Sequence, residues 1–262
     1  MLIRDSKSRF SNRVGNYSRY RPGYPHEVIG LLRKACELTT KSEVADVGSG
    51  TGILSRLFLE NGNKVYGVEP NASMREASER LLAAYPHFQS VSASAEATTL
   101  PRASVDFVVA GQALHWFEPD RARAEFLRIL RPGGWVVVIW NERRTESTPF
   151  LRDYEKLLRT YSTEYSEVAA TYPKATTLAG FYRGEYRGES FDNEQVLDFE
   201  GLRGRLLSSS YTPPDGHPNY KPMLDELQAI YDSHEIDGRV LLEYDTRVYY
   251  GHLCLTAASA WK

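Results

Sequence analysis

Apolar residues follow two different spacings between residues 44 and 140. Short apolar runs predict buried strands at 44–47, 64–68, 88–92, 105–110 and 135–140. Between them, apolar residues recur every three or four positions and predict helices that begin at residues 53, 72 and 121. This alternation indicates a parallel sheet covered by helices on both faces. Ligands of such sheets bind beyond the carboxyl ends of the strands.

The pattern changes on either side of this block. Residues 1–24 are polar and aromatic and predict an arm or short helix, with a further helix starting at Pro25. Arg131-Pro132-Gly133-Gly134 is predicted to be a turn. After residue 141 we predict helices at 149–170, 200–209 and 220–234, an extended segment at 186–199 and a strand at 240–250. The expected organisation is an arm (1–24), a ligand-binding core (25–141), an inserted cap (142–235) and the last strand and tail of the core (236–262).

Composition narrows the possible partners. The formal net charge of −2 gives no basic excess, so we expect no nucleic-acid partner. No apolar run approaches the roughly 20 residues that span a bilayer, so no membrane association is expected. Cys36 and Cys254 lack metal-ligand spacing; we predict no metal site and a cytoplasmic location. The 17 tyrosines suit a small-molecule pocket, although chance and partial burial explain them equally well.

A glycine loop follows the first predicted strand and precedes the first helix of the block. Gly48, Gly50 and Gly52 would let the backbone turn sharply and approach a ligand closely. The dinucleotide fingerprint G-x-G-x-x-G does not fit, because its third glycine would fall on Ile53 or Ser55. This argues against an NAD-dependent oxidoreductase. Asp46, just before the turn, could bind backbone N–H groups or a cationic amine.

Glu69 lies at the end of the second predicted strand, in Val65-Tyr66-Gly67-Val68-Glu69-Pro70. An acidic residue at this place can accept hydrogen bonds from both ribose hydroxyls of a nucleotide. The alternative is a carboxylate that caps the helix beginning after Asn71.

Five elements together resemble the class I S-adenosylmethionine-dependent methyltransferases. The spacing D-x-G-x-G-x-G at 46–52 is similar to their motif I, and the other four elements follow in the family's order at 65–70, 94–101, 105–117 and 130–135. Phe10-Ser11-Asn12-Arg13, the segment Tyr17 to Pro25 and Ala113 to Phe117 resemble the trans-aconitate methyltransferase-like proteins of the methyltransferase type 11 group. The resemblance covers about half of the chain.

The resemblance implies a Rossmann-like, seven-stranded, mostly parallel α/β sheet with a C-terminal cap insertion. It implies S-adenosylmethionine as the cofactor, with the arm closing over it. Tyr17 would cover the methionine part and Arg21 would pair with its carboxylate, unless Arg21 forms only a surface ion pair. Ser94 stands where the family usually has an acidic residue. The positions that the resemblance marks as cofactor-facing are Asp46, Gly48, Gly50, Glu69, Ser94, Ala95 and Gln112.

The implied reaction is in-line methyl transfer to a small-molecule carboxylate, hydroxyl or carbon, catalysed mainly by alignment. His115 is the candidate base, since it follows the fourth strand and has a near-neutral ordinary pKa. The alternative is a structural histidine packed beside Trp116. Tyr211 and Ser208-Ser209-Ser210 are candidates for lining the acceptor pocket. Two alternative functions stay open: a nucleic-acid or protein methyltransferase, and a non-catalytic cofactor-binding protein. The sequence is compatible with a monomer or a homodimer.

Overall fold

The computed structural model describes residues 14–165 and 175–254. Its centre is a seven-stranded sheet of order β3-β2-β1-β4-β5-β7-β6. The strands are β1 (Glu43–Val47), β2 (Lys64–Val68), β3 (Phe88–Val91), β4 (Val105–Gly111), β5 (Leu130–Arg143), β6 (Tyr186–Leu197) and β7 (Val240–Gly251). Strands β1 to β5 are parallel to one another, and β7 runs antiparallel to both β5 and β6. The predicted mostly parallel seven-stranded α/β sheet is confirmed.

Helices cover both faces of this sheet because successive strand residues point to opposite sides. On one face, Val44 of β1 packs with α3 (Glu27–Cys36) and α4 (Ile53–Glu60). On the other, Ala45 and Val47 pack with α6 (Pro119–Ile129) and α9 (Ala175–Tyr182). Helix α5 (Ala72–Leu81) follows β2 and is capped by Asn71, whose Oδ1 accepts from the Met74 N–H at 3.1 Å. The short 3₁₀ helix η1 (Leu114–Trp116) follows β4.

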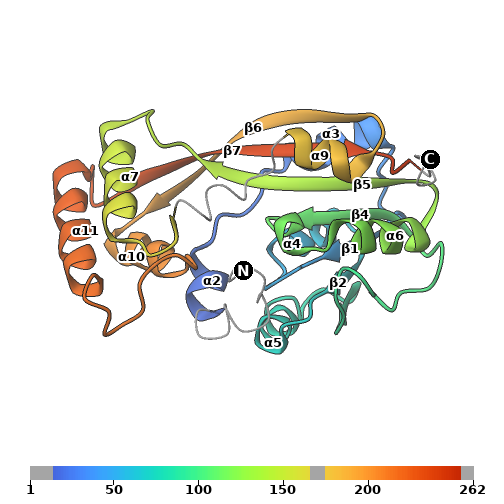
Figure 1. Ribbon diagram of the computed structural model, residues 1–262, viewed down its shortest axis with the longest axis horizontal. Helices are drawn as coiled ribbons and strands as arrows, with labels where there is room; N and C mark the ends of the chain where they lie inside the picture. Colours follow the sequence, from blue (N-terminus) through green and yellow to red (C-terminus); the bar gives the residue numbers. More distant parts are fainter. Residues whose placement is uncertain (1–13, 166–174, 255–262) are drawn as a thin grey trace, which may run out of the picture.

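A second group of helices lies beyond the carboxyl ends of the core strands. We call three of them the cap helices: α7 (Pro149–Tyr161), α10 (Phe199–Leu207) and α11 (Tyr220–His234). They pack on the first half of β7, around Val240, Leu242 and Tyr244, and lie at the left in Figure 1. Helix α2 (Val14–Tyr20) lies between α10 and α5. Residues 142–235, predicted as one insertion, contribute to both parts of the structure: β6 is a strand of the sheet and α9 packs on its face, whereas α7, α10 and α11 form the separate group.

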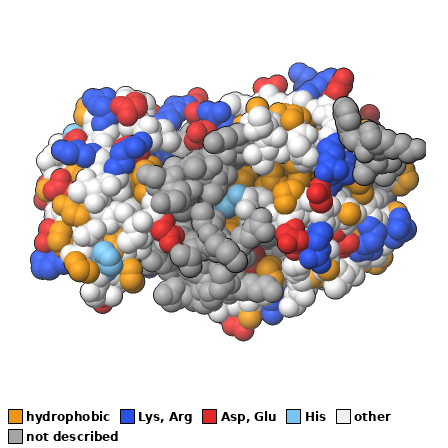
Figure 2. All heavy atoms as spheres, viewed as in Figure 1, with side chains coloured by type: hydrophobic (Ala, Val, Ile, Leu, Met, Phe, Trp, Pro, Cys, Tyr) orange, Lys and Arg blue, Asp and Glu red, His pale blue; other side chains and the backbone are white. Residues whose placement is uncertain are grey.

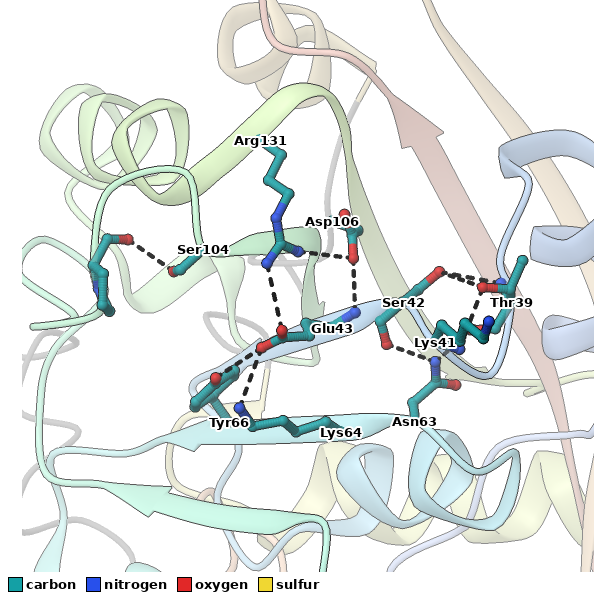
Figure 3. A network of polar contacts seen from close by, with 11 residues as sticks. Thr39, Lys41, Ser42, Glu43, Asn63, Lys64, Tyr66, Ser104, Asp106 and Arg131 are labelled. Carbon is teal, nitrogen blue, oxygen red and sulfur yellow. Dashed lines mark hydrogen bonds and ion pairs between the residues drawn. The ribbon is translucent and has the colours of Figure 1, made fainter.

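The Arg131-Pro132-Gly133-Gly134 segment was expected to be a turn and instead forms a bulge inside β5. Val105 pairs with Leu130 and Phe107 with Trp135, so four residues of β5 face Asp106 alone. Figure 3 shows how the bulge is held: Arg131 Nη1 lies 2.9 Å from Asp106 Oδ2 and Nη2 lies 3.4 Å from Glu43 Oε1. The bulge therefore sits at the amino ends of β1 and β4, away from the glycine loop.

Several boundaries differ from the expectation. Helix α3 begins at Glu27 rather than Pro25, and α9 was not predicted. Strand β5 continues to Arg143 because its last eight residues, 136–143, pair with β7. The predicted helix 149–170 ends at Tyr161 as α7, and its last residues, 166–170, lie outside the described residues, as does the Phe10-Ser11-Asn12-Arg13 motif.

Candidate functional site

The glycine loop joins β1 to α4 and needs glycine at three positions. Gly48, Gly50 and Gly52 all have positive φ angles, of 72°, 56° and 84°. A Cβ at Gly48 would lie 2.7 Å from the Cβ of Ala113, and one at Gly52 would lie 2.6 Å from Leu82 Cδ1. A Cβ at Gly50 would meet nothing within 4 Å. The loop is thus closely packed at its ends and faces open space at Gly50.

A pocket that is partly open to solvent lies at this loop. Six of the predicted site residues line it: Tyr17, Arg21, Asp46, Gly48, Gly50 and Gln112. Glu69, Ser94, Ala95 and His115 do not. The sequence reasoning missed the other lining residues, which are Pro22, Tyr24, Ser49, Thr51, Ile53, Leu54, Gly111 and Asn141. Four of these eight, Pro22, Ser49, Thr51 and Gly111, are adjacent in the chain to a predicted site residue, and this adjacency was the available signal for them.

Asp46 is a buried carboxyl group at the end of β1, with 1% of its surface exposed. Its Oδ2 accepts from the Ser55 hydroxyl at 2.6 Å, whereas Oδ1 has no hydrogen-bond partner among the described residues. Burial, followed by the charge of Glu69, raises the pKa of Asp46 to about 7. A buried oxygen without a donor is costly, so a cationic donor in the pocket would be favoured here.

Glu69 lies at the end of β2 and is also buried. Its Oε2 accepts from the Gly50 N–H at 2.9 Å and its Oε1 accepts from the Asn71 N–H at 2.8 Å. Burial raises its pKa, and these two hydrogen bonds oppose that shift. The carboxylate therefore ties the glycine loop to the start of α5, and Asn71 itself caps that helix. Each oxygen retains a further lone pair, and the ribose role of Glu69 stays a prediction.

Ser94 and Ala95 follow β3. Ala95 is 5% exposed and packs in the core beside Leu114, while Ser94 O accepts from the Ala97 N–H at 3.2 Å. Glu96 Oε1 accepts from the Glu118 N–H at 2.9 Å. These contacts hold the segment against the loop after β4, and the adenine contacts of Ser94 and Ala95 stay predictions.

Gln112 and Asn141 join three parts of the chain at the carboxyl edge of the sheet. Gln112 has a φ of 56°, and its Nε2 donates to the Asn141 carbonyl at 3.0 Å. Asn141 Nδ2 donates to the Gly23 carbonyl at 2.9 Å, which fixes the arm. The Tyr24 ring lies against Gly111, where a Cβ would be 2.6 Å from its hydroxyl oxygen. Glycine at 111 therefore lets Tyr24 reach the pocket wall.

Arg21 lies just after α2 and faces the same pocket. Its Nη2 donates to the Ser208 carbonyl at 3.0 Å, and its guanidinium lies 4.8 Å from the centre of the Tyr17 ring. Within 14–165 and 175–254, no carboxylate forms an ion pair with Arg21, so the surface ion pair is not seen there. Burial, followed by the charge of Arg205, lowers its pKa.

His115 lies in η1 and is half-buried between two indole rings. Its ring centre is 4.6 Å from that of Trp116 and 5.6 Å from that of Trp140. This is the packing that the structural alternative predicted, and the role of His115 as a base stays a prediction.

Comparison with known proteins places the region around the pocket in a family. Residues 45–138 match the methyltransferase domain family. An uncharacterized methyltransferase of Mycobacterium tuberculosis is 40% identical over 140 residues, which are 53% of this chain and 55% of that protein. The match thus spans about half the length of these mycobacterial relatives. An uncharacterized methyltransferase-like protein of Schizosaccharomyces pombe is 24% identical over 92% of this chain and 93% of its own.

Solved structures share the fold. A protein of Anaeromyxobacter dehalogenans, provisionally named a type II methyltransferase, has a TM-score of 0.65 at 22% identity over 89% of this chain and 98% of its own. Phosphoethanolamine N-methyltransferase 2 of Haemonchus contortus, solved with S-adenosylmethionine, has a TM-score of 0.55 at 13% identity, covering 92% of this chain and 57% of that one. The chain therefore carries a class I methyltransferase domain, and the cofactor of this class is S-adenosylmethionine. The narrower likeness to trans-aconitate methyltransferase-like proteins stays a prediction.

Two kinds of feature are absent from the part of the chain that the structure describes. No helix in 14–165 or 175–254 is long and apolar enough to cross a membrane. The same residues hold no group of three or more His, Cys, Asp or Glu side chains arranged to bind a metal ion.

Proposed function

We propose that this protein transfers a methyl group from S-adenosylmethionine to a small-molecule acceptor in the cytoplasm. The observation that carries the proposal is the pair of opposite groups on the pocket wall, the unpartnered Oδ1 of Asp46 and the guanidinium of Arg21. An amino-acid tail carries an amine and a carboxylate, and these two side chains complement it. The match of residues 45–138 to methyltransferase domains supports the same cofactor.

The remaining residues fit the rest of this cofactor. The open space at Gly50 admits a ligand against the backbone of the loop. Glu69 keeps lone pairs for ribose hydroxyls, and Ser94 and Ala95 are our candidates for the adenine. Tyr17 and Tyr24 line the pocket from the arm and shield it from water.

When bound, S-adenosylmethionine supplies a methyl group already activated by its sulfonium. The residues of this chain then need to orient the acceptor and keep water out, and such alignment contributes about 7–11 kcal/mol in well-oriented reactions. A carboxylate acceptor needs no base, and a hydroxyl or a reactive carbon does. His115 is the candidate base for the second case, with the tryptophan packing as the competing role.

The expected partner is a small molecule rather than a nucleic acid. Lys and Arg side chains are interspersed with Asp and Glu on the face shown in Figure 2, and no continuous basic surface is visible over the described residues there. The net charge of −2 agrees with this.

Isothermal titration tests the cofactor. S-adenosylmethionine should bind and NAD should not. Asp46→Asn keeps the shape of the side chain and removes its charge, so it should weaken S-adenosylmethionine binding at least tenfold. Asp106→Asn, at the opposite edge of the sheet, is the matched control and should leave the affinity unchanged. Binding of NAD instead, or no binding of S-adenosylmethionine by the wild-type protein, would reject the proposal.

A further inference from the structure

Two side chains of β6 hold the backbone of the arm from outside the pocket. Gln195 Nε2 donates to the Tyr20 carbonyl at 3.0 Å, and Asn193 Nδ2 donates to the Gly23 carbonyl at 2.9 Å. Asn193 and Gln195 do not line the pocket themselves, but the two carbonyls lie on either side of Arg21, which does. The two hydrogen bonds therefore fix the piece of the arm that forms one wall of the pocket.

The two amides share one face of β6. Residues two apart along a strand point to the same side of the sheet, so Asn193 and Gln195 both face the arm. Glu194, between them, points to the other side and is exposed. Both contacts are made to main-chain carbonyls, so they fix the path of the backbone itself.

Gln195 is oriented by a chain of hydrogen bonds that starts in the cap helices. Arg205 Nε donates to the Tyr244 hydroxyl oxygen at 3.1 Å, and this hydroxyl donates to Gln195 Oε1 at 2.8 Å. The amide oxygen of Gln195 therefore faces Tyr244, and the amide nitrogen faces the Tyr20 carbonyl. Consecutive hydrogen bonds polarise one another, which favours this single arrangement.

Asn193 is oriented by Asn141, a residue of the pocket wall. Asn141 Oδ1 accepts from the Thr246 hydroxyl at 2.6 Å and lies 3.2 Å from Asn193 Nδ2. Asn141 Nδ2 donates to the Gly23 carbonyl at 2.9 Å, so this carbonyl receives one donor for each of its two lone pairs. Asn141 and Thr246 are 4% and 0% exposed, which shields the network from water on that side.

These contacts form what we call the arm clamp, which consists of Asn141, Asn193 and Gln195. The clamp lies outside residues 45–138, the part of the chain that matches the methyltransferase domain family. The segment of the arm that it holds, residues 20–23, lies outside that part as well. The fixed position of the arm is thus a property that β5, β6 and β7 add to the family domain.

We propose that Asn193 and Gln195 are positioning residues for the proposed methyl transfer. By holding the backbone on both sides of Arg21, they set where this guanidinium faces the methyl donor. The bonds to the Gly23 carbonyl likewise set the place of the next residue, Tyr24, on the pocket wall. This inference rests on the proposed function, because it takes the pocket to be the donor site.

Neighbouring residues of β6 provide the first test, in the ligand-free protein. Asn193→Ala removes a donor to the arm, and Glu194→Ala changes the side chain on the other face. Hydrogen exchange read by mass spectrometry should become about fivefold faster in residues 14–23 for Asn193→Ala, as loss of one hydrogen bond predicts, and stay unchanged for Glu194→Ala. Exchange in β7 should not change. Faster exchange in β7 as well would show that the sheet itself is loosened and would overturn the positioning role.

A second test separates hydrogen-bond donation from packing. Asn193→Asp and Gln195→Glu keep the size of the side chain and one acceptor oxygen, and replace the donor to the arm by a second acceptor. Titration should show S-adenosylmethionine affinity about fivefold weaker in each variant and weaker still in the double variant. Asn193→Ala, which adds no charge, should weaken it to a similar extent. Wild-type affinity in the double variant would show that the two amides only fill space, and would overturn the inference.

The two tests distinguish failure of this inference from failure of the proposed function. Unchanged exchange of the arm in Asn193→Ala would overturn the inference whatever the wild-type protein binds. Absence of S-adenosylmethionine binding by the wild-type protein would reject the proposed function. Faster exchange of the arm in that case would leave the arm clamp as a purely structural contact and overturn its role in methyl transfer.

Discussion

Asp46 and Glu69 are two carboxyl groups buried at one loop, and each is held by donors of the chain. Ser55 donates to Asp46, and the amides of Gly50 and Asn71 donate to Glu69. Burial nevertheless raises the pKa of both groups. Protons are therefore retained by the folded protein at pH values where the unfolded chain has lost them.

The pH dependence of stability follows from this shift. Asp46 titrates at about 7 in the folded protein and near its ordinary value of 3.8 in the unfolded chain. Its contribution is fully present below pH 4 and is lost as the pH rises to about 7, on the order of 4 kcal/mol in all. Urea unfolding of the ligand-free protein should show this decline. Asp46→Asn should flatten it, and an unchanged slope in that variant would contradict the assignment.

Glu69 provides a second prediction at the same loop. Glu69→Ala leaves the N–H groups of Gly50 and Asn71 without their acceptor, and an unsatisfied buried donor costs about 1–3 kcal/mol. We expect lower stability in urea and at least tenfold weaker binding of S-adenosylmethionine by titration. Glu69→Gln, which keeps one acceptor oxygen, should lose less stability. Unchanged cofactor affinity in both variants would remove the ribose role.

Residues of the pocket differ in how far the sequence could predict them. Asp46, Gly48 and Gly50 stand in a short motif whose spacing is visible along the chain, and all three line the pocket. Asn141 and Tyr24 line it too, but Asn141 acts by binding the carbonyl of Gly23, 118 residues earlier. Contacts between residues so far apart depend on how the arm folds back on the sheet, and no local pattern encodes them.

At the scale of elements, α2 is held by close contacts of Tyr20 with β6 and α10. The Gln195 amide donates to the Tyr20 carbonyl at 3.0 Å, and a Cβ at Gly204 would overlap with the Tyr20 ring. Glycine at 204 thus allows α2 to approach α10, and this approach brings Arg21 to the pocket.

Gly204→Ala should therefore displace α2. Alanine favours a helix over glycine by about 1 kcal/mol, but the clash with Tyr20 opposes that gain. We expect weaker binding of S-adenosylmethionine by titration and faster tryptic cleavage after Arg19. Gly180→Ala in α9 is the control, since its Cβ would meet nothing within 4 Å and should only stabilise. Equal affinity in the two variants would show that the arm does not depend on this contact.

The sequence predicts a helix or strand well where the apolar spacing within that segment determines its structure. It predicts less well where pairing with another strand determines the structure. Helix α11 has the predicted bounds, Tyr220–His234, because its apolar spacing is its own property. The Arg131 to Gly134 segment has the residues of a turn, yet it stays within β5 because β4 pairs with the residues before and after it, Leu130 and Trp135. The amphipathic pattern is also weak in α9, which packs on the core through Leu178, Phe181 and Tyr182.

At the scale of the whole molecule, one strand passes through two hydrophobic cores. Val240, Leu242 and Tyr244 of β7 pack with the cap helices, while Val248 and Tyr250 of the same strand pack with α3 and α4. Because β7 is continuous, it joins the two ends of the elongated molecule in Figure 1 without a flexible linker.

Unfolding in urea should accordingly be a single transition. Trp116, Trp135 and Trp140 lie in the core half, so tryptophan fluorescence reports mainly on that half, whereas far-ultraviolet circular dichroism also reports on the cap helices. The two midpoints should coincide. Loss of helical signal at lower urea, before any change in fluorescence, would show that the cap helices unfold independently.

The continuity of β5 and β7 has a consequence for how such a protein can diversify. The pocket is built on the loops at the ends of β1 and β4, whereas the cap helices rest on the part of β5 and β7 that extends beyond β4. Substitutions on the outer faces of the cap helices therefore leave the glycine loop unchanged. A lineage can vary this end of the molecule by point mutation and keep the loop at the other end.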